Sequence, residues 1–79
     1  MTTKQRTIKG LERQITSCES VCEKWNREIN WRLDSINSHG HIWGAAWVKR
    51  HRDEVRQIEI RIDEQTQEIN DLQEMLNQI

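Results

Sequence analysis

The apolar residues of this chain recur at intervals of three and four positions along two long stretches, and no other feature restricts the fold as strongly. The first stretch runs from Ile8 to Ile36 and the second from Val48 to Ile79. Such spacing brings apolar side chains to one face of an α-helix, and over several heptads it is typical of a coiled coil. The chain has no Pro and three Gly in 79 residues, which favours long helices. We therefore predict an all-α chain with two helices.

A glycine-containing stretch between Asn37 and Trp47 interrupts this pattern once. Gly40 and Gly44 lie within it, and a residue without Cβ can take positive φ where a chain reverses. We expect an antiparallel helical hairpin with a heptad seam, in which Thr3 caps the first helix without the Glu of a capping box. The expected single domain, residues 1–79, consists of a helix over about 3–38, a bend over about 39–45 and a helix over about 46–78.

Three polar residues are expected on the seam: Arg32 from the first helix, and His51 and Gln65 from the second. A bend centred on Ile42 pairs Arg32 with His51. A bend centred on Gly40 would instead leave buried polar groups without partners. We favour the bend at Ile42 and interpret the polar seam residues as setting the register of the two helices.

Charge is distributed unevenly along the chain. Residues 1–52 carry ten Lys or Arg and five Asp or Glu, whereas residues 53–79 carry two and eight, within a net charge of −1. An antiparallel hairpin would lay the basic start of the first helix beside the acidic end of the second, and we expect ion pairs between them. The acidic second half disfavours a chain that binds nucleic acid along its whole length.

A hairpin of this length has a thin core, and self-association is a common remedy in small domains. Three large apolar residues fall outside the expected seam, at Val21, Leu33 and Ile60. Two hairpins that pack together would give these residues a second surface to contact. We therefore predict a homodimer that forms a four-helix bundle.

Four Trp residues occur in a chain without Phe or Tyr, and three of them lie near the bend among basic residues. Trp and Arg are enriched at binding hot spots, because they bury a large area with few lost rotamers. A second interpretation stays open, in which the indoles close the end of a thin bundle and the basic residues are only solvated. The residues predicted to bind a partner are Trp31, Trp43, Trp47, Lys49, Arg50 and Arg52.

Catalytic and metal sites find little support in the sequence. No glycine-rich phosphate loop is present, and no nucleophile falls within reach of a base in the expected pairing, so we expect neither an enzyme nor a cofactor. The spacing of His39, His41 and His51 matches no zinc signature. Cys18 and Cys22 lie one helical turn apart, where a disulfide is geometrically awkward, and we expect reduced thiols without a metal.

The leading hypothesis for function is a small non-enzymatic protein-binding module that acts through the bend or the outer helix faces. An adaptor, a chaperone or an inhibitor would fit this description, and so would a phage protein directed at a host machine. A nucleic-acid-binding regulator and a purely structural coiled coil are the alternatives. No apolar run could span a bilayer, so we expect a cytoplasmic protein. In length and expected topology the chain resembles small bacterial or plasmid-encoded hairpin regulators, a likeness of architecture only.

Overall fold

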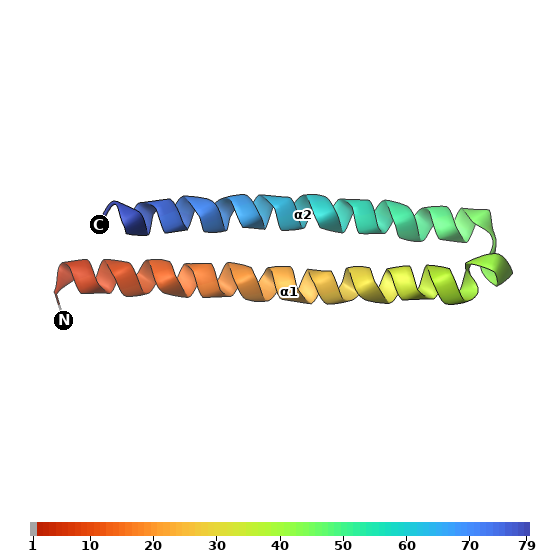
Figure 1. The fold of residues 1–79 in the computed structure, drawn as a ribbon, viewed down its shortest axis with the longest axis horizontal. Coiled ribbons are helices and arrows are strands. Elements are labelled where there is room, and N and C mark those ends of the chain that lie inside the picture. The colour runs from red at the N-terminus through yellow and green to blue at the C-terminus, as the bar shows by residue number, and fades with distance from the viewer. Residues whose placement is uncertain (1) are drawn as a thin grey trace.

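The computed structural model describes residues 2–79 as two long helices packed side by side in opposite directions (Figure 1). Helix α1 spans Thr3–Trp43 and helix α2 spans Ala45–Asn77. The molecule is a rod of 60 × 16 × 12 Å, with the two chain ends at one end and the bend at the other. The predicted all-helical hairpin is confirmed. Within residues 2–79, neither helix has a stretch apolar enough to cross a membrane.

The cap of α1 lies one residue earlier than predicted, at Thr2, and it forms a capping box. The hydroxyl of Thr2 accepts a hydrogen bond from the Gln5 backbone N–H at 3.2 Å, and Gln5 Oε1 accepts one from the Thr2 N–H at 2.9 Å. The prediction of Thr3 as a cap without a box is wrong, because the Gln amide reaches back to the cap as a Glu carboxylate does. Two N–H groups that the first helical turn leaves without partners are thereby satisfied.

The bend is shorter than the predicted stretch 39–45, because α1 continues through Gly40 to Trp43. Gly40 stays helical and serves the contact between the helices. A Cβ atom placed on it would lie 3.1 Å from Cγ2 of Val48, which is closer than side chains normally approach. The predicted end of the first helix at Ser38 is therefore wrong.

Gly44 alone reverses the chain. Its backbone has φ 93° and ψ 168°, a combination open essentially only to glycine. The Gly44 N–H donates to the carbonyl oxygen of Gly40 at 3.2 Å, and the Gly44 carbonyl accepts from the Val48 N–H at 3.1 Å. One residue thus ends α1 and starts α2, so the two helices are connected by a single sharp turn.

The core is a narrow strip between the helices. Residues of low exposure recur three and four positions apart on both helices, and we call these the interface residues. The most deeply buried are Leu11, Ile15, Val55, Ile58 and Leu72, and each still keeps some solvent exposure. A cluster of Leu11, Ile15 and Leu72 lies toward the chain ends, because Leu11 and Ile15 are near the start of α1 and Leu72 is near the end of α2. The buried apolar area is therefore small for the length of the rod.

The expected ion pairs between the helices do not form. Among residues 2–79, the side-chain ion pairs within 4 Å join Arg32 to Glu28 at 3.1 Å and Lys49 to Asp53 at 3.6 Å. Each pair lies within one helix, although the basic start of α1 does run beside the acidic end of α2. Exposed ion pairs gain little in water and cost side-chain freedom, so antiparallel charge does not by itself bring such side chains together.

Candidate protein-binding site at the bend

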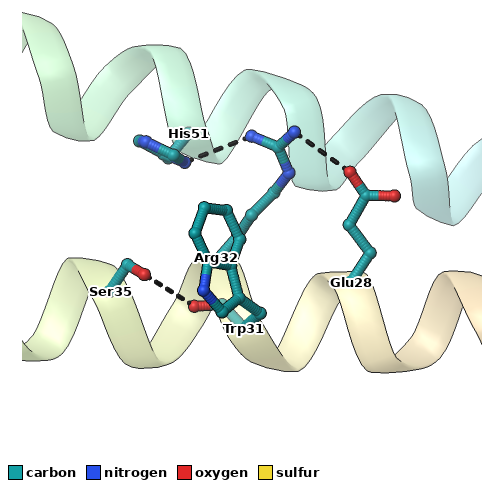
Figure 2. A network of polar contacts seen from close by, with 5 residues as sticks. All are labelled: Glu28, Trp31, Arg32, Ser35 and His51. Atoms are coloured by element: carbon teal, nitrogen blue, oxygen red, sulfur yellow. Dashed lines mark hydrogen bonds and ion pairs between the residues drawn. The ribbon is translucent and has the colours of Figure 1, made fainter.

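A polar contact joins the two helices near the bend (Figure 2). The guanidinium of Arg32 donates from Nη1 to Nδ1 of His51 at 3.2 Å and from Nη2 to a Glu28 oxygen at 3.1 Å. A guanidinium cannot accept, so His51 accepts at Nδ1 and its ring proton lies on Nε2. Nε of Arg32 is buried without a partner. Two of the three predicted seam residues are thus in contact, while Gln65 lies half-buried farther along the helix interface.

Glu28 also belongs to this contact, although it is not among the predicted site residues. Glu28 precedes Arg32 by four positions, the spacing at which acidic and basic side chains meet on a helix, and that signal was present in the sequence. Glu28 holds the second half of the guanidinium and so keeps the first half directed at His51. The arginine is therefore positioned from both helices.

The indole of Trp31 covers the Arg32–His51 contact from one side (Figure 2). Its ring centre lies 6.1 Å from that of His51 in an edge-on arrangement, and Cζ of Arg32 lies 5.8 Å from the indole centre. Ser35 donates a hydrogen bond to the Trp31 carbonyl oxygen at 2.9 Å. Trp31 nevertheless remains 60% exposed, so most of its ring faces solvent.

Ring contacts continue from His51 to the bend. The ring centres are 4.3 Å apart for Trp47 and His51, 5.7 Å for Trp43 and Trp47, and 6.4 Å for His39 and Trp43. These four residues follow one another at intervals of four, and the spacing continues across the corner at Gly44. This four-residue spacing is visible in the sequence, but whether it brings the rings into contact depends on where the chain turns.

The hairpin has two long sides that differ in composition. A helix turns by about 100° per residue, so the residue before each interface residue points to one side and the residue after it to the other. In antiparallel helices the preceding residues of both helices share a side, and Trp31 and Trp47 accordingly both contact His51. We call the side of the preceding residues the tryptophan flank, and the side of the following residues the opposite flank.

The structure divides the residues predicted to bind a partner. Trp31, Trp47 and Arg50 precede interface residues and belong to the tryptophan flank, whereas Lys49 and Arg52 belong to the opposite flank. Trp43 is the last residue of α1 and lies at the end of the rod. The residues predicted to form a single cluster therefore lie on three neighbouring surfaces.

The end of the rod at the bend, which we call the bend end, exposes two large apolar side chains. Ile42 is 68% exposed and Trp43 is 62% exposed. Ile42 was missed as a contact residue, because its exposure depends on α1 continuing past Gly40. A shallow groove beside the bend, the bend groove, is lined by Gly40, Ala45, Val48, Lys49, Arg52 and Asp53.

Val21, Leu33 and Ile60 are exposed, but they do not form one face. Val21 precedes the interface residue Cys22 and lies on the tryptophan flank, whereas Leu33 follows Arg32 and lies on the opposite flank. Ile60 points away from α1, because it is about 200° around α2 from the buried Ile58. The predicted contact of all three with one second hairpin therefore does not fit their positions.

The structure does not gather the candidate metal ligands into one site. Among residues 2–79, no group of three or more His, Cys, Asp or Glu side chains is placed to hold a metal ion. Nδ1 of His51 accepts from Arg32, and the ring of His39 lies against Trp43. Cys18 and Cys22 are half-buried free thiols.

Replacing both Arg32 and His51 by leucine is expected to stabilise the hairpin relative to either single variant. His51→Leu alone should cost about 1–3 kcal/mol, because it leaves a second guanidinium nitrogen group short of a partner. Well-packed apolar residues often match or exceed a buried polar contact by about 1–4 kcal/mol. Urea denaturation followed by circular dichroism measures all four members of the cycle. A double variant no more stable than Arg32→Leu would contradict this account.

The site thus combines exposed indoles, an exposed isoleucine and unpaired basic side chains. Among residues 2–79, Arg50 and Arg52 form no ion pair, and Lys49 pairs only with Asp53 on its own helix. Such a surface can bury the apolar groups of a partner and bind its negatively charged groups. In comparisons with known proteins, no family model, no curated protein and no solved structure matches this chain.

Proposed function

We propose that the chain is a small non-enzymatic protein-binding module, acting as an adaptor or inhibitor, whose bend end docks on an acidic protein surface. The exposure of Ile42 and Trp43, at 68% and 62%, is the observation that carries the proposal. Large apolar side chains that are exposed to water lose this contact when a partner covers them. Trp is also among the residue types most enriched at binding hot spots.

The bend groove supports an acidic partner. Gly40, Ala45 and Val48 give it a lining that is apolar or small, and its charged lining residues are Arg52 and the ion pair of Lys49 with Asp53. The guanidinium of Arg52 offers a planar pair of donors that matches a carboxylate. A protein partner can pair Asp or Glu with Arg52 while it covers Trp43. A nucleic-acid backbone would also meet the acidic half of α2, which repels phosphate.

For the scaffold, we propose a coiled-coil seam and a homodimer that forms a four-helix bundle. The interface residues recur at three-four spacing, and the five most buried of them are not fully shielded by one hairpin. Packing against a second hairpin is a common way for helices of this length to complete a core. A cytoplasmic location agrees with the free thiols of Cys18 and Cys22, because thiols stay reduced there.

The Ile42→Ala/Trp43→Ala variant is expected to reduce partner capture by about 30-fold, the equivalent of 2 kcal/mol at a hot spot. A photo-crosslinking residue at Ala46, which is exposed beside the bend, would capture the partner in cells that express the chain. Leu33→Ala is the matched control, because Leu33 is also large, apolar and exposed but lies away from the bend end. This control should capture the partner as the unmodified chain does.

Two results would reject the proposal. Equal capture by the bend variant and the control would show that the bend end does not bind. Tight binding of single-stranded oligonucleotides, with a logarithmic salt slope that reports several phosphate contacts, would support the nucleic-acid alternative instead. Loss of capture together with a shallow salt slope is the result expected for contacts made mainly by Ile42 and Trp43.

A further inference from the structure

The hairpin exposes more surface than a compact chain of its size. Its accessible area is 6230 Å² for a mass of 9.5 kDa, whereas a folded monomer of that mass is expected to expose about 5000 Å². The excess of about 1200 Å² exceeds the roughly 800 Å² that each partner contributes to an interface of standard size. A second copy of the chain could therefore cover one side of the rod without using the bend end.

The two long sides of the rod are not equally suited to this role. On the opposite flank of α1, charged and amide side chains follow nearly every interface residue, and Leu33 is the one large apolar exception. On the tryptophan flank, Trp31 and Val21 are exposed on α1, and Met75 is exposed on α2. The part of this flank near the start of α1 is uncharged, with Thr7, Gly10, Gln14 and Ser17, and all of these except Gln14 are small. Only the tryptophan flank offers both bulky apolar groups and room to receive them.

Charge along the tryptophan flank of α2 changes sign from one end to the other. Arg50 and Glu54 lie in the half nearer the bend and Arg61 lies at the middle, whereas the other half carries Glu64, Glu68 and Asp71 without a basic residue. When two such helices run antiparallel, Arg50 of each lies opposite the acidic half of the other, where opposite charges attract. Two parallel hairpins would instead set this acidic half against the uncharged start of α1.

We infer that the tryptophan flank is the interface between two copies of this chain, which pack antiparallel with α1 on α1 and α2 on α2. The inference rests on the homodimer proposed above and names its surface and orientation. With the two-fold axis at the middle of the rod, near position 23 of α1, Trp31 of one copy lies level with Gln14 and Ser17 of the other. Arg50 of one copy lies level with Glu68 and Asp71 of the other.

Substitution on the two flanks tests which side is covered. Trp31→Glu should weaken the dimer by about 100-fold or more, because it would bury a carboxylate without a partner. Leu33→Glu places the same charge two residues away on the opposite flank and should leave the dissociation constant of the dimer unchanged. Sedimentation equilibrium over a concentration series measures both, and circular dichroism checks that each variant keeps its helices. Equal effects of the two substitutions, or an effect of Leu33→Glu alone, would overturn the inference.

Spin-label distances test the orientation in the dimer of the full chain with Cys18 and Cys22 replaced by alanine. Labels at Lys24→Cys, near the middle of the tryptophan flank, should lie within about 20 Å of each other. Labels at Ser38→Cys should lie about 45 Å apart, because each is about 15 residues from the axis at 1.5 Å per residue. Labels at Asn26→Cys, on the opposite flank, should be about 25–30 Å apart, the thickness of two helix layers.

Each other pattern of distances has a definite meaning. Short distances at both Lys24 and Ser38 would show a parallel dimer, and a shorter distance at Asn26 than at Lys24 would show packing through the opposite flank. Either result overturns the inference while leaving a dimer in place. A monomer at every concentration would overturn the dimer as well. None of these outcomes affects partner capture through Ile42 and Trp43, which is measured separately.

Discussion

Replacement of Gly44 by alanine is expected to destabilise the hairpin by about 1–3 kcal/mol, the usual cost of holding a residue with a Cβ in this region of backbone space. Apart from Gly44 itself and its two neighbours in the chain, no residue has an atom within 4 Å of the position that the new Cβ would occupy. The cost therefore comes from the backbone at φ 93° and not from a clash. Urea denaturation of the variant and the unmodified chain at matched concentration measures the difference.

Gly10→Ala is the matched control for this substitution. Gly10 is helical, its Cβ would also have no neighbour within 4 Å, and its φ is not in the positive range. The same change should therefore stabilise the chain by about 1 kcal/mol, the difference in helix propensity. If both variants shift stability in the same direction, the reversal at Gly44 does not depend on its backbone conformation.

Ile58→Ala is expected to cost about 2–5 kcal/mol, because it removes a side chain that is only 4% exposed in a thin core. A domain of this size has a total stability of about 4–12 kcal/mol, so the variant would be largely unfolded or close to it. Thermal denaturation should show a Tm lower by about 10 °C or more.

Ile60→Ala provides the comparison, since it removes the same atoms two positions away on the same helix. Ile60 is 46% exposed and points away from α1, so its loss should change stability by less than about 0.5 kcal/mol. Similar losses for the two variants would mean that a second molecule buries Ile60. That result would also contradict a dimer formed through the tryptophan flank.

The hairpin and the contact between Arg32 and His51 could be predicted because they depend on the spacing of apolar residues and on the pairing of buried polar groups. Apolar residues at three-four intervals determine which face of each helix is buried, and Pro-free helices allow few topologies. The requirement that buried polar groups find partners was enough to set Arg32 opposite His51, and the structure has these side chains in contact at 3.2 Å.

The corner of the hairpin was not predictable in the same way. Gly40 and Gly44 have the same side chain, and a glycine can serve either a close approach between helices or a positive φ. Only the packed structure distinguishes them, with Val48 against Gly40 and the reversal at Gly44. The exposure of Ile42 and the ring contacts of Trp43 and Trp47 follow from the reversal at Gly44, so they too could not be predicted from the sequence.

The placement of the bend at one extremity of a 60 Å rod has a consequence for how an antiparallel dimer would meet its targets. The two bend ends would point in opposite directions, separated by about the length of the rod, so the assembly would be bivalent. Its two ends could not bind one small target at the same time. It could bridge two targets, and its avidity would rise steeply on an array whose repeat matches the rod, because the second attachment becomes intramolecular.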